Sequence, residues 1–424
     1  MKMLLILFLP LFLFSKTLTI YNDNLAYITA KKEVVINNKE FYIYDLPRNI
    51  IKPSLRVNLD MADIVSYEFK DRSFTKQLLK KNLNKEVDFI VNKKIKRGKL
   101  IKIEPIIVIE DLNKRYYILY DPNKIVSYED MINNFSNLYL KVKTTAPKNR
   151  KSKLFLSYLV NGLRWKTSYF LELNKNRLNL DAFVEIDNKT DKNFKEYKIS
   201  LVSGSLNRRY SFPLRHKSLA KIEDSEIKPK KIDSFYVFDL PFNATIKKDS
   251  RKIFKLFGQE DIQFNTFYTT KSYPFNKYSS NLNFQRVLEF KTLKVLPKGE
   301  ARVYKNGVFL GEDFIENSPK NSKIKLSLST EFDLKGKKIV KEYINKKGYK
   351  KIVLEYQIKN SASESKNILI NEHLPKYFAS KIEHKTSCKK SCKSSKKDAF
   401  TYVYKIKLKP NSSYKFDVIY EAFD

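Results

Sequence analysis

The chain has few of the residues on which most catalytic and metal sites are built. Its 424 residues include three histidines, two cysteines, one tryptophan and nine glycines. Serine–histidine or cysteine–histidine arrangements therefore have little material to form from. The sequence also contains no G-x-S-x-G, H-E-x-x-H or glycine-rich phosphate-binding pattern. We predict no catalytic, cofactor-binding or metal-ligating residue, and the composition favours a binding or structural protein over an enzyme.

Long hydrophobic runs are missing beyond the N-terminus, so the sequence predicts no transmembrane span after signal cleavage. The N-terminus places Lys2 before an apolar run from Leu4 to Phe14, followed by Ser15. That run is too short for a membrane-spanning helix and is typical of a secretory signal. We expect residues 1–16 to be a cleavable signal peptide, with retention as an anchor as the alternative. The expected location is the periplasm or cell envelope.

Arginine is scarce among the positive charges. Lysine and arginine total 83 against 46 acidic residues, a net charge of +37, and only 14 of the 83 are arginine. Proteins that bind phosphates through paired hydrogen bonds rely on arginine, so nucleic acid is not an expected partner. A/T-rich codon usage explains much of the lysine excess, and a solvated lysine surface is the default interpretation, but such a surface still attracts polyanions through a salt-sensitive field. We therefore expect anionic envelope polymers or partner proteins to bind; the sequence does not fix an oligomeric state.

The two cysteines, Cys388 and Cys392, lie in a polar, lysine-rich loop. In an oxidising compartment they could form a local disulfide. His384 extends the spacing to H-x3-C-x3-C, which could also hold a metal ion. Six lysines within residues 385–397 would repel a cation, so we predict a disulfide or free thiols and keep the metal or redox site as a remote alternative.

Apolar and polar residues alternate with period two along most of the chain, and 14% of the residues are aromatic. Both features are typical of strands. The sequence therefore predicts an all-β, mainly antiparallel protein, built from hairpins packed as sandwich- or barrel-like modules with few short helices. We expect an N-terminal β segment (17–66), a small β module with one short helix (67–140), and a C-terminal β-rich domain (141–424) with an irregular loop at about 208–232.

The single tryptophan lies beside a strong hairpin signal. Asn161-Gly162 separates two alternating runs, and both central residues of a type I′ turn need positive φ. A two-residue loop would place Tyr158 opposite Trp165, on an apolar face shared with Tyr169. We predict that these three aromatic residues form structural core and do not contact a substrate.

A second Asn-Gly pair, Asn306-Gly307, lies between the runs ARVYK and VFLGED. The same turn chemistry predicts a hairpin here, with Tyr304 facing Phe309.

Paired carboxylates are hard to recognise in a sequence, so a hydrolase acting on envelope glycans is the alternative function. Glu312-Asp313 after Gly311 is the best acidic cluster, but neighbouring strand residues point to opposite faces. His373 is expected to be structural, and His216 to lie in the solvated irregular loop. Alternating lysine and tyrosine in TYVYKIKLK could form a basic stacking strip, although the expected export and the scarcity of arginine argue against it.

Several blocks of the chain carry a family resemblance. LSYLVNGLRWKTSYFLEL with LNLDAFVEIDNKTDKNFKEYKISLVSGSLN, LPKGEARVYKNGVFLGEDFIENSPKNSKIKLSLSTEFDL, and near the start IYNDNLAYITAKKEVVINN with DLPRNIIKPSLRV resemble a family of uncharacterised exported bacterial proteins. Their C-terminal domain of unknown function also occurs in mucoidy-inhibitor-like proteins. The resemblance implies an exported, β-rich protein of unestablished activity, and no catalytic residues carry over from it. It covers nearly the whole chain except residues 210–235 and the cysteine loop.

Overall fold

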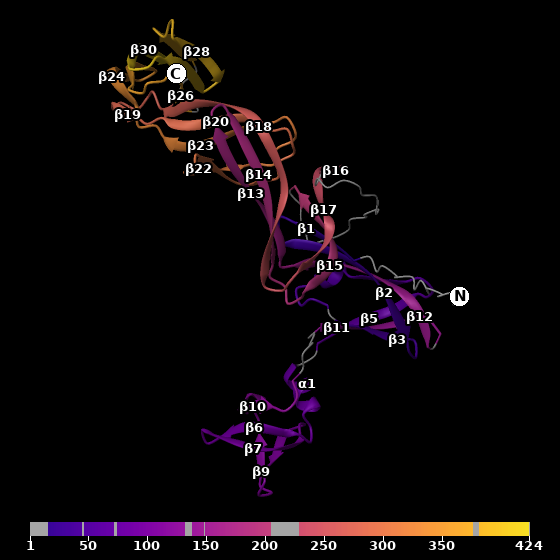
Figure 1. Cartoon of the computed structure of the whole chain (residues 1–424). Helices are drawn as coiled ribbons and strands as arrows, with labels where there is room; N and C mark the ends of the chain where they lie inside the picture. The colour runs from indigo at the N-terminus through magenta and orange to yellow at the C-terminus, as the bar shows by residue number, and fades with distance from the viewer. Residues whose placement is uncertain are drawn as a thin grey trace, which may run out of the picture. The chain divides into compact units, whose positions relative to one another are not determined.

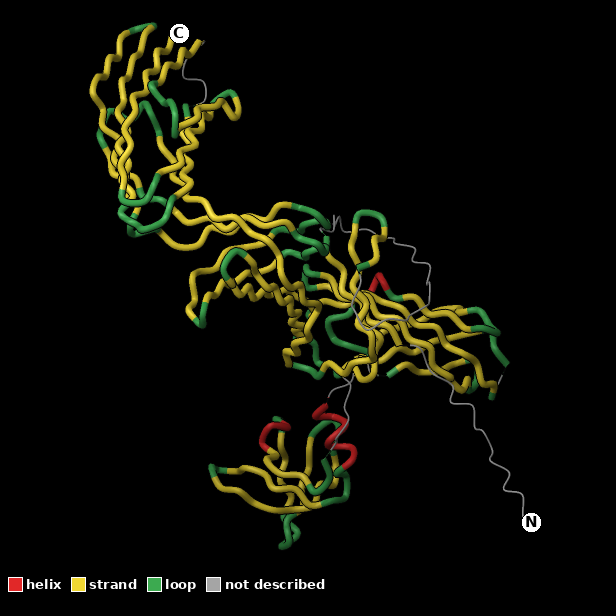
Figure 2. Tube along the Cα trace, turned by 45° about the horizontal axis from the view of Figure 1, so that its top comes forward, coloured by secondary structure: helices red, strands yellow, loops and turns green. Residues whose placement is uncertain are grey.

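The computed structural model describes residues 16–44, 46–71, 74–131, 138–147, 149–204, 229–375 and 381–423. Within these ranges the chain forms thirty strands and a single α-helix, and most strand pairs are antiparallel. Strands dominate every part of the trace in Figure 2. The predicted all-β, mainly antiparallel fold is confirmed. The predicted signal peptide, apart from its last residue, and His216 lie outside the described residues.

The chain divides into two compact units. Unit 1 comprises residues 1–165 and 186–252, and unit 2 comprises residues 166–185 and 253–424. The predicted segments 17–66 and 67–140 both lie in unit 1, whereas 141–424 contributes to both units. The reason is that the unit boundary falls inside three long strands, β13 (Leu163–Asn174), β14 (Arg177–Asn188) and β18 (Ser250–Ser272). No helix in the described ranges has the length and apolar character needed to cross a bilayer.

The largest sheet in the described part of unit 1 has seven strands. Its alternating residues bury one apolar row per strand, as in the fully buried Leu18 and Ile20 of its central strand. That strand runs parallel to one neighbour and antiparallel to the other. The sheet order is β16 (Lys230–Ile232), β17 (Phe235–Ile246), β15 (Phe194–Ser203), β1 (Lys16–Tyr21), β2 (Leu25–Ile36), β12 (Arg150–Asn161) and β4 (Arg56–Leu59).

The irregular loop expected at 208–232 is only partly described. Residues 205–228 lie outside the described ranges, and residues 230–232 form β16, the edge strand paired with β17.

A three-stranded sheet of unit 1 has one apolar and one polar–aromatic face. Phe41, Ile43, Leu140 and Val142 alternate inward on two paired strands and are buried. Their sequence neighbours face outward. The strands, in sheet order, are β3 (Glu40–Ile43), β11 (Leu138–Thr144) and β5 (Ile64–Asp71), and a 3-10 turn, η1 (Lys52–Ser54), precedes β4.

The helix α1 (Phe74–Lys81) lies in the segment 67–140, for which one short helix was expected, and a five-stranded sheet follows it in sequence. Leu79 of the helix joins Phe89, Leu100 and Ile109 of the sheet in one buried cluster. The sheet order is β10 (Ile125–Tyr128), β6 (Glu86–Val91), β7 (Lys94–Lys102), β8 (Ile107–Glu110) and β9 (Tyr116–Leu119), with a 3-10 turn, η2 (Pro122–Lys124), before β10.

Unit 2 contains a ten-stranded and a five-stranded sheet that share one core, which is a sandwich arrangement. Ile370 and Tyr404 from the first sheet pack in the same cluster as Leu354 and Val418 from the second. The first sheet adds to β13, β14 and β18 the strands β22 (Val308–Ile315), β21 (Gly299–Lys305), β26 (Lys366–His373), β29 (Thr401–Leu408), β28 (Cys392–Asp398), β20 (Gln285–Lys291) and β23 (Lys323–Thr330). The second contains β19 (Ser280–Leu282), β24 (Leu334–Lys346), β25 (Tyr349–Asn360), β30 (Ser412–Phe423) and β27 (Lys381–Thr386). Figure 1 labels most of these strands, among them β18, β24 and β30.

The hairpin predicted at Asn161-Gly162 is wrong. β12 pairs with β2 and β4, whereas β13 pairs in parallel with β21, so the two strands on either side of the turn belong to different sheets. Tyr158 pairs with Ile28 and does not face Trp165 across a turn. Only Gly162 has a positive φ, of 96°, whereas a type I′ turn needs two such residues. The long ladder with β2 outweighs the local turn preference.

The second Asn-Gly pair does form a hairpin. Asn306 and Gly307 have φ values of 51° and 76°, and β21 pairs with β22 on either side of them. Tyr304 lies opposite Phe309, with ring centroids 5.5 Å apart.

Candidate anion-binding site

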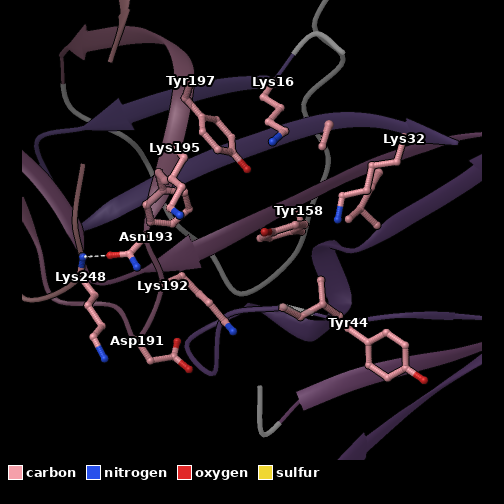
Figure 3. A pocket seen from close by; sticks show the side chains of 14 residues that line it. Lys16, Lys32, Tyr44, Tyr158, Asp191, Lys192, Asn193, Lys195, Tyr197 and Lys248 are labelled. Atoms are coloured by element: carbon pink, nitrogen blue, oxygen red, sulfur yellow. Dashed lines mark hydrogen bonds between the residues drawn. The ribbon is translucent and has the colours of Figure 1, made fainter. Parts of the chain in front are cut away.

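A pocket of about 480 Å³ lies over one face of the seven-stranded sheet of unit 1. Figure 3 shows lysine and tyrosine side chains around it. The residues that line it come from β1, β2, β12 and β15 and from three connecting segments. They are Lys16, Ala30, Lys32, Tyr44, Leu46, Leu156, Tyr158, Asp191, Lys192, Asn193, Phe194, Lys195, Tyr197 and Lys248.

The floor of the pocket is a row of side chains across four adjacent strands. Lys16 pairs with Ala30, which in turn pairs with Leu156. On the other side of Lys16, its neighbour is Tyr197, because each of these residues comes directly before a paired position of the parallel strands β1 and β15. The Lys16 ammonium lies 5.9 Å from the centre of the Tyr197 ring. Because Ala30 has the smallest side chain of this row, it leaves the floor hollow.

A buried asparagine fixes two turns at the rim. Asn188 is fully buried, and its side-chain amide donates to the carbonyl oxygens of Lys192 and Lys247 at 2.9 and 2.8 Å. The backbone amide of Lys248 donates to Asn193 Oδ1 at 2.8 Å, a contact drawn in Figure 3. These bonds tie the turn after β14 to the turn after β17. They hold two of the pocket lysines, Lys192 and Lys248, on the same rim.

The charge balance of the lining is strongly positive. Five lysines surround the pocket, and the lining contains one carboxylate, Asp191. One oxygen of that carboxylate accepts a hydrogen bond from the backbone amide of Arg48 at 3.1 Å. No arginine lines the pocket. Clustered lysine ammonium groups attract anions as point charges and do not impose the planar geometry that arginine does.

Two tyrosines add neutral hydrogen-bond donors. Burial raises the pKa of Tyr158 well above its ordinary value, with smaller contributions from Tyr197 and Asp191. Burial also raises the pKa of Tyr197. Both phenols therefore stay protonated at neutral pH and can donate to an anion or a hydroxyl group. Tyr158 was predicted to be core; its side chain is buried, and the residue also contributes to the pocket lining.

The other two aromatic residues predicted as core do not line this pocket. Trp165 is 2% exposed, its indole Nε1 donates to the carbonyl oxygen of Val202 at 3.2 Å, and its ring packs edge-on to Phe238. Tyr169 is fully buried in unit 2 and donates to the carbonyl oxygen of Pro297 at 2.5 Å.

The cysteines are joined to each other in the structure. The sulfur atoms of Cys388 and Cys392 lie 1.96 Å apart as a disulfide. The imidazole of His384 stacks on Tyr402 and is hydrogen-bonded through Nε2 to the Tyr404 hydroxyl at 2.8 Å. In the described part of the chain, no group of three or more His, Cys, Asp or Glu residues is arranged to hold a metal ion.

The remaining sequence candidates have structural partners. Glu312 pairs with Arg302 at 3.2 Å, and both carboxylate oxygens of Asp313 accept backbone amides. His373 Nδ1 is 3.3 Å from the Thr401 hydroxyl. The tyrosines of TYVYKIKLK are buried in the sandwich core, as Tyr404 is, and so do not form an exposed stacking strip.

The most unusual polar group was not anticipated from the sequence. Glu372 on β26 is fully buried in the sandwich and accepts hydrogen bonds from the hydroxyl groups of Tyr356 and Tyr420. Burial raises the pKa of its carboxyl group, against the opposing effect of these hydrogen bonds. The Tyr404 hydroxyl connects the network to His384. The alternation of β26, in which Ile368 and Ile370 point inward, carries the only signal, because it puts an acid at the next inward position.

Comparison with known proteins supports one assignment. The family model described as Domain of unknown function (DUF4139) matches residues 154–422. No curated protein matches the chain significantly. The matched region begins in β12 and ends in β30, so it includes Tyr158 and the rim turns of the pocket but not Lys16 or Lys32. Because the match covers well over half of the 424 residues, the chain belongs to the DUF4139 family.

Proposed function

We propose that this chain is an exported, non-catalytic protein of the cell envelope that binds anionic polymers in the lysine-lined pocket of unit 1. The observation that supports the proposal is the gathering of five lysines against one carboxylate around a single hollow. A solvated lysine surface spreads its charges, whereas convergent charges raise the local concentration of an anion and retain it.

The pocket also offers groups that define an orientation. Tyr158 and Tyr197 remain neutral donors because burial raises the pKa of each phenol. The amide of Asn193 is held by its hydrogen bond from the Lys248 backbone. A polymer with anionic groups and oxygen atoms between them would satisfy both the lysines and these donors.

The alternative of a carboxylate-dependent hydrolase needs two acids on either side of the scissile bond. Asp191 is the one carboxylate in the lining, and Glu372 is enclosed in the sandwich core. The binding function is therefore the better supported of the two. Incubation with peptidoglycan and lipopolysaccharide fragments tests this directly, and shortened products would overturn the non-catalytic proposal.

The decisive experiment separates the pocket from the overall charge. The triple variant Lys32→Gln/Lys195→Gln/Lys248→Gln removes three charges from the lining. With polyphosphate as the probe, we expect its affinity to fall by roughly tenfold or more, and the slope of log K against log salt to become shallower by roughly two. The matched control Lys335→Gln/Lys393→Gln/Lys407→Gln removes the same charge from exposed positions of unit 2.

A second variant tests the hollow without changing charge. Ala30→Leu places a larger side chain on the pocket floor, and we expect it to weaken polyphosphate binding while thermal unfolding shows a folded protein. Equal losses in the pocket variant and in the matched control would show that only overall charge matters, and the proposal would then be abandoned.

A further inference from the structure

Three tyrosines form a ring cluster on the outward face of the three-stranded sheet. Tyr42 and Tyr44 have ring centroids 6.2 Å apart, and Tyr139 of β11 lies 6.1 and 5.7 Å from them. Tyr42 is 44% exposed and Tyr44 is 43% exposed. The buried neighbours Phe41 and Ile43 hold the backbone of β3 against the core. We refer to Tyr42, Tyr44 and Tyr139 as the tyrosine platform.

The tyrosine platform is continuous with the lysine-lined pocket, because Tyr44 belongs to both. Figure 3 shows Tyr44 at the edge of the pocket. The charges beside the platform are balanced, unlike those of the pocket. Lys141, which pairs with Tyr42, forms an ion pair with Glu40 at 2.9 Å. The site therefore has an aromatic part of balanced charge and a strongly cationic part next to it.

Each part matches a different feature of one ligand class. The face of an aromatic ring carries partial negative charge and attracts C–H groups, so the flat C–H face of a sugar ring packs on it. The lysines attract carboxylate or phosphate substituents. A polymer of phosphate alone would use the pocket and leave the tyrosine platform without a role.

We infer that the polymer is an anionic glycan, whose sugar rings lie on Tyr42, Tyr44 and Tyr139 while its acidic groups reach the pocket lysines. The inference rests on the proposed function of the pocket and specifies its substrate class. Single-stranded nucleic acid also combines stacking with negative charge. A glycan is favoured because no arginine lines the pocket, and arginine is the usual residue for phosphate and nucleic-acid recognition.

The test compares three probes on the full chain: an oligogalacturonate, polyphosphate and an oligo-dT of similar charge. The variant Tyr42→Ala/Tyr139→Ala leaves the pocket lining intact, because neither residue lines it. We expect its affinity for oligogalacturonate to fall by roughly tenfold, with polyphosphate affinity unchanged. The control Tyr120→Ala/Tyr278→Ala removes tyrosines that are 85% and 65% exposed elsewhere, and both affinities should match the wild type.

The outcomes distinguish this inference from the proposed function. If oligogalacturonate and polyphosphate bind but the Tyr42→Ala/Tyr139→Ala variant binds both as the wild type does, the glycan assignment is wrong and the pocket function stands. If neither probe binds the wild type, the pocket function itself fails. Tighter, tyrosine-dependent binding of oligo-dT would replace the glycan with nucleic acid.

Discussion

Glu372 is a carboxylate in a position that an apolar residue would fill. On β26 it continues the inward row of Ile368 and Ile370, and its oxygen atoms face the hydroxyl groups of Tyr356 and Tyr420. Burying an ionised carboxylate is costly even with good hydrogen bonds, so the protonated form is favoured. Buried Lys338 acts in the opposite direction by favouring the ionised form. The folded state therefore holds this proton more tightly than the unfolded chain does.

The substitution Glu372→Gln should remove a pH dependence of stability. Because the folded pKa is raised above the ordinary value of 4.5, the stabilising contribution is complete below pH 4.5 and is lost as the pH rises through the folded pKa. Glutamine imitates the protonated acid, so urea denaturation should show a flatter pH profile for the variant than for the wild type. Parallel profiles would contradict the raised pKa, and Glu260→Gln, at an exposed position, provides the baseline.

His384 should titrate far below the usual range of a histidine. Burial against the rings of Tyr402 and Tyr420 lowers its pKa from 6.5 to about 4. The contribution of the neutral His384 imidazole to the stability of the fold is therefore complete above pH 6.5 and is lost as the pH falls towards 4. A tenfold change in proton affinity is equivalent to about 1.4 kcal/mol, so the upper limit of the stability lost is about 3 kcal/mol. Because solvent partly reaches the imidazole and screens its charge, the actual loss is smaller. An NMR titration of the imidazole should show a midpoint near 4, and a midpoint near 6.5 would refute the prediction.

A substitution separates the charge of His384 from its packing. His384→Phe keeps a ring on Tyr402 but removes the ionisable group and the hydrogen bond to Tyr404. We expect a loss of about 1 kcal/mol at pH 7, from the missing hydrogen bond, and no further loss of stability from this site as the pH falls from 6.5 to 4.

The sequence could not reveal this network because its partners are distant. Tyr356 and Tyr420 lie 16 and 48 residues from Glu372. In the sequence, an inward-facing acid near the end of a strand cannot be distinguished from the point where the apolar row simply stops. The tyrosines come close to it only because the two sheets pack together. By contrast, Cys388 and Cys392 are four residues apart, so their proximity is a local property that the sequence does contain.

At the scale of elements, the two Asn-Gly pairs show what a local signal can decide. β21 and β22 are short, adjacent strands, and the turn between them determines their pairing. β12 is twelve residues long and pairs with β2 along its whole length. Each added pair contributes hydrogen bonds and buried side chains, so a long ladder outweighs a turn preference. The turn preference can be recognised in the local sequence, whereas the pairing of β12 with the distant strand β2 cannot.

The parallel pair β13–β21 depends on close backbone approach at Gly299. A Cβ atom at this position would lie 2.3 Å from the carbonyl oxygen of Thr167, the residue paired with it. Because β21 is held on its other side by β22, the strands cannot separate freely. We expect Gly299→Ala to destabilise the protein by about 1–3 kcal/mol in chemical denaturation.

The control for this prediction is the glycine in the turn that follows β21. Gly307 has no neighbouring atom within 4 Å of an added Cβ, and its φ is 76°. Asparagine tolerates positive φ, so Gly307→Asn should stay within about 0.5 kcal/mol of the wild type. Equal stability of Gly299→Ala and the wild type would show that the close approach is not needed.

At the scale of the whole molecule, the sequence predicts the fold class well and the proposed binding site poorly. Period-two alternation reflects the burial of one face of each strand, which is a local property. The pocket lysines come from positions as far apart as Lys16 and Lys248. Nothing in the sequence distinguishes these five within the total of 69 lysines, which is 83 basic residues minus 14 arginines. The two compact units cannot be recognised from the sequence either, because β13, β14 and β18 each contribute residues to both units.

The small sheet that follows α1 has a core of its own. Its buried cluster runs from Leu79 to Ile125 and includes Phe89, which is fully buried against the ring of Tyr117. We therefore expect a fragment covering residues 72–137 to fold alone, with dispersed amide resonances in NMR and cooperative urea unfolding. A chain of this size is near the lower limit for independent folding, so its stability should be only a few kcal/mol, roughly 3–5.

The Phe89→Ala variant of that fragment provides the matching negative control. Truncating a buried phenylalanine costs about 3–5 kcal/mol, which equals the whole expected stability, so the variant should lose its dispersed spectrum while the parent fragment keeps it. If neither fragment gave dispersed amide resonances, the core from Leu79 to Ile125 would be insufficient for folding on its own. The contacts that complete it would then have to come from the rest of the chain.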